Sequence, residues 1–166
     1  MRYLVEQARD RLLRKCEELP GGGEIVPWIV YDTEVFYAHK TEHLDFFQRP
    51  GRYPKTNMYL PAMLPAPQEF LIESIRLTGL PSALLASAAV LQIGAKIYGV
   101  YPAVSLCLKG RGFHLDPPLL IDELRVFRFG MEWEAQTGIG LGVQGVPIYE
   151  KRVQVELIGK LVRPRQ

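Results

Sequence analysis

The stretch RVFRFGMEWE (residues 125–134) alternates between apolar and polar side chains. The apolar set is Phe127, Phe129, Met131 and Trp133, and the charged set is Arg128, Glu132 and Glu134. A period of two residues belongs to a β-strand, because successive side chains of a strand point to opposite faces of its sheet. The stretch therefore predicts a strand with one face in a core and the other in water.

The same period recurs along the chain. RVQVELIGKL (residues 152–161) alternates in the same way, with Val153, Val155, Leu157 and Leu161 on one side and Gln154, Glu156 and Lys160 on the other. QEFLIESIRLTG (68–79), TEVFYA (33–38) and EIVPWIVY (24–31) are also predicted strands, and Pro27 marks an edge strand or a bulge. In AVLQIGAKIYGVYP (89–102) two apolar runs flank Gly94 and Ala95, which predicts a tight hairpin. The preceding PSALLAS (81–87) predicts a short helical turn started by Pro81, and the total is about eight strands.

Residues 2–19 have a helical period instead. Their apolar residues fall on one stripe: Leu4, Val5, Ala8, Leu12, Cys16 and Leu19. Pro20 and the glycines at 21–23 end this helix and form a hinge. We expect an N-terminal arm over residues 1–20 and one domain over 24–166. The stripe packs on its own domain, docks on a neighbouring subunit or lies on a membrane surface; the candidate subunit contacts are Leu4, Val5, Ala8 and Leu12.

Long connections separate the strands: QRPGRYPKTN (48–57), YLPAMLPAPQ (59–68), KGRGFHLDPP (109–118) and TGIGLGVQGVP (137–147). A parallel sheet needs helical crossovers, and the sequence contains no second amphipathic helix to supply them. The predicted fold is therefore all-β: an antiparallel β-sandwich or jelly roll of about eight strands with an N-terminal α-helix.

Composition narrows the class of protein. The chain has 166 residues and a net charge of +2, with 20 basic residues against 18 acidic ones, so it lacks the dense basic surface that direct nucleic-acid binding needs. Cys16 and Cys107 fit no metal or redox spacing and are predicted to be buried free thiols. The charged N-terminus does not have the pattern of a signal peptide, so we expect the protein to be used inside a cell. The uncharged run 77–95 contains Pro, Gly and Gln, which argues against a transmembrane helix.

One motif suggests metal chemistry. YAHKTEHLDFF (37–47) contains H-x-x-E-H, a zinc-peptidase pattern. The pattern works on a helix, whereas in a strand His39 and His43 stand about 13 Å apart, too far for one zinc ion. The flanking β-branched and aromatic residues favour a strand, so we expect both histidines in a polar turn before Leu44, Phe46 and Phe47 return to the core.

The remaining motifs are weaker still. G-x-G-x-x-G at 140–145 is followed by a strand rather than the helix a dinucleotide site needs. GRGFHLD brings Arg111, His114 and Asp116 together without a nucleophile. Glu132 and Glu134 have a glycosidase-like spacing, but alternating charge on the wet face of a strand is the commoner cause. The aromatic residues of RVFRF are predicted to face the core and not a nucleic acid. We predict neither an enzyme nor a cofactor or metal site.

The order of these segments resembles a known family. TNMYLPAMLPAPQEFLIESIRLTG (56–79) followed by AVLQIGAKIYGVYP is similar to single-jelly-roll viral capsid proteins. The nearest resemblance is to the small major capsid protein of tailless icosahedral phages that contain an internal membrane and infect thermophilic bacteria, and it spans residues 56–162.

The resemblance implies a structural role. It implies a subunit without cofactor or small-molecule substrate, which binds itself and a second, larger jelly-roll capsid protein in a shell near a lipid membrane. The implied location is the virion capsid, assembled in the host cytoplasm. The single asparagine and 13 prolines suit a hot host. Two alternatives stay open: a β-sandwich module that binds carbohydrate or another small ligand, and a metalloenzyme.

Overall fold

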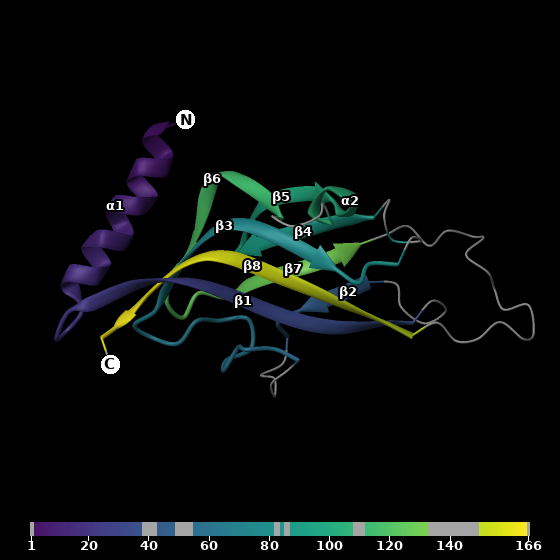
Figure 1. Cartoon of the computed structure of the whole chain (residues 1–166), viewed down its shortest axis with the longest axis horizontal. Coiled ribbons are helices and arrows are strands. Elements are labelled where there is room, and N and C mark those ends of the chain that lie inside the picture. Colours follow the sequence, from purple (N-terminus) through teal and green to yellow (C-terminus); the bar gives the residue numbers. More distant parts are fainter. Residues whose placement is uncertain are drawn as a thin grey trace, which may run out of the picture.

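The computed structural model describes residues 2–37, 43–48, 55–81, 84, 87–107, 112–132 and 150–165. Within these residues the chain forms two antiparallel four-stranded sheets with a helix at the N-terminus (Figure 1). The strands are β1 (Gly23–Tyr37), β2 (His43–Phe46), β3 (Glu69–Thr78), β4 (Ala88–Ile93), β5 (Lys96–Pro102), β6 (Phe113–Ile121), β7 (Phe127–Glu132) and β8 (Glu150–Pro164). The helices are α1 (Arg2–Glu18) and the single turn α2 (Ala103–Leu106).

The strand order shows how one chain builds both sheets. The first sheet has the order β1-β8-β3-β6 and the second has the order β2-β7-β4-β5. The pairs β1 with β8, β2 with β7, β3 with β6 and β4 with β5 are nested, as in one long hairpin, and successive pairs fall in opposite sheets. This is jelly-roll wiring. The predicted all-β sandwich of eight strands with an N-terminal helix is confirmed.

The alternating stretches line the core as predicted. In β7 the side chains of Phe127, Phe129 and Met131 are buried, while Glu132 is exposed. The four apolar residues predicted for β8 are buried in the same cluster: Val153, Val155, Leu157 and Leu161. Leu44, Phe46 and Phe47 also reach this core, and the rings of Phe47 and Phe127 have their centroids 5.2 Å apart. The prediction that the aromatics of RVFRF face inward is confirmed.

The predicted hairpin joins β4 to β5 across Gly94 and Ala95. Gly94 has a φ of 60°, in the left-handed region that glycine adopts without strain. At the predicted turn before β4, the Leu84 N–H donates to the Pro81 carbonyl at 2.9 Å. Residues 77–95 therefore contain strand and turn, and the described helices include none that is long and apolar enough to span a membrane.

Helix α1 packs on the outer face of the first sheet. Leu12 and Leu19 are buried against Leu71 of β3 and Val162 of β8, with Ala8 and Cys16 at the same contact. Figure 1 shows α1 standing at the end of the sandwich where β8 finishes, close to the C-terminus. Of the three alternatives left open for the stripe, these described side chains show the first, packing on the chain's own domain.

Ion pairs lie along one side of this helix contact. Lys15 Nζ lies 3.3 Å from Glu123 Oε2 and 3.9 Å from Glu69 Oε1, and Arg11 pairs with Asp122. These acids come from the start of β3 and from the connection between β6 and β7. The contact is therefore apolar at its centre and charged along one side.

Two predictions about segments are wrong. KGRGFHLDPP was expected to be a loop, but its residues from Phe113 onward belong to β6. Prolines fit there because β6 is an edge strand and its register with β3 shifts between Ile72 and Ser74, so Pro117 and Pro118 need supply no ladder donor. EIVPWIVY and TEVFYA were expected to be separate strands, yet EIVPWIVY and the described residues 33–37 lie in the continuous β1. Pro27 does mark an edge strand, as predicted.

Candidate interaction surfaces

β1 is an edge strand, and the segment that follows residue 54 covers the side of β1 that faces away from β8. Asn57 Oδ1 accepts a hydrogen bond from the Tyr31 N–H at 2.9 Å, and Asn57 Nδ2 donates to the Ile29 carbonyl at 2.6 Å. Thr56 Oγ1 donates to the Tyr31 carbonyl at 2.8 Å. These side chains take the place of a neighbouring strand, so this part of the β1 edge is closed to a partner.

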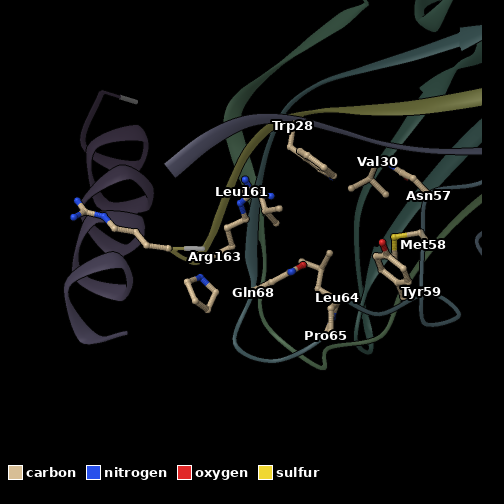
Figure 2. A pocket seen from close by; sticks show the side chains of 12 residues that line it. Trp28, Val30, Asn57, Met58, Tyr59, Leu64, Pro65, Gln68, Leu161 and Arg163 are labelled. Carbon is tan, nitrogen blue, oxygen red and sulfur yellow. The ribbon is translucent and has the colours of Figure 1, made fainter. Parts of the chain in front are cut away.

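Beside this contact lies a cleft of about 310 Å³. Figure 2 shows Trp28 on one side of it and Leu64, Pro65 and Tyr59 on the other. Trp28 is 39% exposed. Tyr59 is 86% exposed, so both aromatic rings are accessible to a ligand.

Some polar groups of this cleft already make hydrogen bonds or ring contacts within the chain. The Arg163 guanidinium lies 5.8 Å from the centroid of the Trp28 ring, and its Nε donates to Glu24 Oε1 at 2.7 Å. Asn57 uses both ends of its amide on β1. The Gln68 side chain lines the cleft as well. The cleft therefore offers ring stacking and a few amide and guanidinium hydrogen bonds.

A second hollow, of about 710 Å³, lies between the edge strands β5 and β6. The exposed His114 and Asp116 line it from β6, and Lys96 and Tyr98 line it from β5. Lys96 Nζ is 4.9 Å from the centroid of the Tyr98 ring. Arg111, the third member of the predicted group, lies outside the described residues. No described group contains three side chains that could share a metal ion.

The outer face of the second sheet is divided into a polar half and an apolar half. On the β2 and β7 side, Asp45 Oδ1 accepts hydrogen bonds from Arg128 Nε and Nη2, both at 2.7 Å. On the β4 and β5 side, outward positions carry apolar residues in register: Ala88 opposite Pro102, and Val90 opposite Val100. Ile97 and Val100 are 57% and 61% exposed. Ile97 lies opposite the polar Gln92. The exposed apolar side chains make this half of the sheet a candidate interaction surface.

The predicted subunit contacts on α1 lie in different surroundings. Leu12 is buried against the chain's own sheet and Ala8 is half-buried beside it. The side chains of Leu4 and Val5 lie outside the described part of the chain. The subunit role of these four residues stays a prediction.

Other sequence motifs fall partly or wholly outside the described residues. In H-x-x-E-H, His39 and Glu42 lie outside, while His43 opens β2 with its side chain exposed. G-x-G-x-x-G at 140–145 and Glu134 also lie outside. Cys16 and Cys107 are free and half-buried, and burial raises the pKa of the Cys107 thiol.

Two buried carboxylates, Asp32 and Glu69, were not predicted from the sequence. Asp32 accepts hydrogen bonds from the Phe47 N–H at 2.6 Å and the Thr33 N–H at 2.9 Å, which ties β1 to the end of β2. Burial raises its pKa even though these bonds act in the opposite direction. The sequence signal was an aspartate inside an apolar strand; its partner, fifteen residues on, could not be inferred from it.

Comparison with known proteins adds no family. No protein-family model matches this chain, and no curated protein sequence matches it.

Proposed function

We propose that this chain is a structural subunit of a viral capsid, a small major capsid protein that assembles with a second jelly-roll protein into an icosahedral shell. The observation that carries the proposal is the jelly-roll wiring combined with an apolar outer face over β4 and β5. The resemblance of residues 56–162 to single-jelly-roll capsid proteins supports it. Jelly rolls also occur in lectins and cupins, so the fold alone does not select this function.

The surfaces fit a shell subunit. The first sheet is covered at one end by α1, whereas Ile97, Val100 and Val104 expose apolar surface near the second sheet. A subunit that must contact neighbours needs such surface, which a monomer in solution would keep small. Assembly in the host cytoplasm, residence in the virion near an internal membrane, and a thermophilic host belong to the same proposal.

The test is assembly in the presence and absence of a partner. The chain is expressed alone and together with any second jelly-roll protein that a neighbouring reading frame encodes, and the products are examined by light scattering and electron microscopy. We expect capsomers or closed particles when both proteins are present. A strictly monomeric chain near 1 mM that never enters particles would contradict the proposal.

The cleft between Trp28 and Tyr59 favours a second candidate, a module that binds carbohydrate or another small ligand. Aromatic rings and nearby amide groups are common in sites that stack sugar rings. A glycan panel screened by thermal shift is the test, with Trp28→Ala as the variant that should lose any response. A panel with no response in the wild-type chain removes this candidate.

A further inference from the structure

Helix α1 is held on the first sheet by a small apolar contact. Among its described side chains only Leu12 is buried, together with Leu19 just beyond the end of the helix, and both pack on Leu71 of β3 and Val162 of β8. The main core cluster of the sandwich contains no residue of the helix. An element with few buried apolar contacts opens at a lower free energy than the core of its domain. The helix can therefore leave the sheet without unfolding the sandwich.

The connection from α1 to β1 can serve as a pivot (Figure 1). Gly21 and Gly22 have φ values of 80° and 84°, in the left-handed region that glycine adopts readily, and a Cβ atom added to either would meet no atom within 4 Å. The chain is fixed to β8 only from this point on. The Arg165 N–H donates to the Gly22 carbonyl at 3.2 Å, and Arg165 Nε donates to the Gly23 carbonyl at 3.1 Å. A change of direction at the two glycines would thus leave β1 in place.

A buried carboxylate lies under the helix. Because side chains alternate along β3 and Phe70 belongs to the core, Glu69 and Leu71 face outward, on the side that α1 covers. Glu69 is only 5% exposed, and its register partner on β8 is the apolar Val162. Its Oε1 atom lies 3.9 Å from Lys15 Nζ, and its Oε2 atom has no hydrogen-bond partner among the described residues. The docked helix therefore covers a carboxyl group that is poorly satisfied.

The charges around Glu69 compensate it only in part. Arg11 and Lys15 face it from α1, and Asp122 and Glu123 face it from the connection between β6 and β7. Lys15 Nζ is closer to Glu123, at 3.3 Å, and Arg11 is paired with Asp122. Burial raises the pKa of Glu69, the two cations oppose this rise, and the two acids add to it. The docked helix therefore favours the protonated carboxyl group.

We propose that ionisation of Glu69 releases α1 from the first sheet as a pivoting arm, while the two sheets stay folded. Release lets water reach the carboxylate, whereas docking buries a charge without enough hydrogen bonds. The apolar contact of Leu12 with Leu71 opposes release, so protonation shifts a balance between the two states. Docking is strongest below pH 4.5, the ordinary pKa of this carboxyl, and weakens as pH rises through the pKa of the docked state.

Hydrogen exchange followed by mass spectrometry measures the release in the full chain. An undocked helix of 17 residues is marginal in water, so its amides exchange once it leaves the sheet. At pH 7, Glu69→Gln should slow exchange in residues 2–18 at least about fivefold relative to wild type, because the neutral amide removes the buried charge. At pH 4 the two chains should agree within about twofold. In wild type the amides of α1 should exchange at least about 100-fold faster than those of β7, after correction for intrinsic rates.

A second variant tests whether charge is the cause. Lys15→Met removes the ammonium group and keeps a flexible stem with similar helix propensity, so it should speed exchange of α1 about threefold at pH 7. In the double variant with Glu69→Gln this effect should disappear, because no buried charge is left to compensate. Glu73→Gln is the matched control: Glu73 is half-exposed on the same strand, 3.5 Å from Lys160 Nζ, and its change should leave exchange of α1 within about twofold.

Four results overturn the release. They are equal exchange of α1 in wild type and Glu69→Gln at pH 7, a difference that persists unchanged at pH 4, equal protection of α1 and β7, and an effect of Lys15→Met that is the same with and without Glu69. Circular dichroism and the melting temperature show that each variant is folded. Because the chain is measured by itself, each of these results leaves the capsid proposal intact, and a chain that never enters particles leaves the release intact.

Discussion

Buried carboxylates show how single residues shape this fold in opposite ways. Asp32 is satisfied by two backbone N–H groups, one of them on Phe47, whose φ of 66° is unusual for a residue with a side chain. Glu69, at the start of β3, has an Oε2 atom that is buried and has no hydrogen-bond partner among the described residues. Asp32 therefore holds two strands together, whereas Glu69 is a point of weakness under α1.

Glu69 predicts a pH dependence of stability. Burial raises the pKa of this carboxyl above 4.5, and Arg11 and Lys15 only partly oppose the shift. The folded state thus holds the proton more tightly than the unfolded state, so the stabilisation is present below pH 4.5 and is lost as pH rises through the folded-state pKa. We expect the free energy of unfolding of wild type to fall relative to that of Glu69→Gln as pH rises from 4 to 7.

Urea unfolding at a series of pH values measures this difference. Glu73→Gln, at a half-exposed position of the same strand near Lys160, is the matched control and should differ from wild type by less than about 0.5 kcal/mol. A constant difference between wild type and Glu69→Gln across the pH range would show that Glu69 does not couple folding to protons.

At the scale of elements, α1 provides adjacent leucines in opposite surroundings. Leu12 is 2% exposed against the first sheet, and Leu13 is 53% exposed. Leu12→Ala should destabilise the protein by about 2–4 kcal/mol, because it removes buried apolar atoms and leaves a cavity. Leu13→Ala should change stability by less than about 0.5 kcal/mol. Equal losses in urea unfolding would mean that α1 does not pack through this face.

The cover on β1 makes a second prediction at this scale. Asn57→Ala removes two hydrogen bonds to β1 and should reduce stability by about 1–3 kcal/mol. Asn57→Asp keeps the acceptor for the Tyr31 N–H and loses the donor to Ile29, so its loss should be smaller. Guanidinium unfolding of both variants checks the order, and a larger loss for Asn57→Asp would contradict the assigned hydrogen bonds.

Strands whose apolar and polar residues alternate clearly could be predicted from the sequence. Strands whose structure depends on their place in the sheet could not. β7 and β8 bury alternate residues along most of their length, with Gly130 and Val162 buried in addition, so the sequence pattern indicates which side faces the core. β6 was missed because Pro117 and Pro118 indicate a loop, and only its edge position and the register shift make them compatible with a strand. β5 reads as an apolar run, and its exposure arises from a position at the sheet edge that sequence does not encode locally.

At the scale of the whole molecule, the sandwich class followed from many strands and one helix, while the placement of the surfaces did not. The cover by Asn57 joins segments 28 residues apart, and the Trp28 cleft also includes Arg163 from the last strand, in a register that only the folded chain defines. The helix stripe predicted a contact, but a stripe is equally apolar whether it meets its own sheet or a neighbour.

Composition makes a prediction for the molecule as a whole. A single asparagine leaves little asparagine deamidation and 13 prolines stiffen loops, which are features of proteins from hot environments. We expect a melting midpoint above about 80 °C by differential scanning calorimetry. A midpoint within the ordinary mesophile range of about 45–65 °C would contradict a thermophilic origin.

The nested pairing of strands also determines when this chain can finish folding during its synthesis. A turn of two residues joins β4 to β5, and in the nested order they are the pair with the shortest connection, so they can form soonest behind the ribosome. β8 is made last, yet it lies between β1 and β3 in the first sheet. Until residues 150–164 emerge, β1 has no neighbour in its sheet and its apolar side stays open to other nascent chains. Many copies of this chain made on one messenger would therefore face their greatest aggregation risk just before the last strand appears.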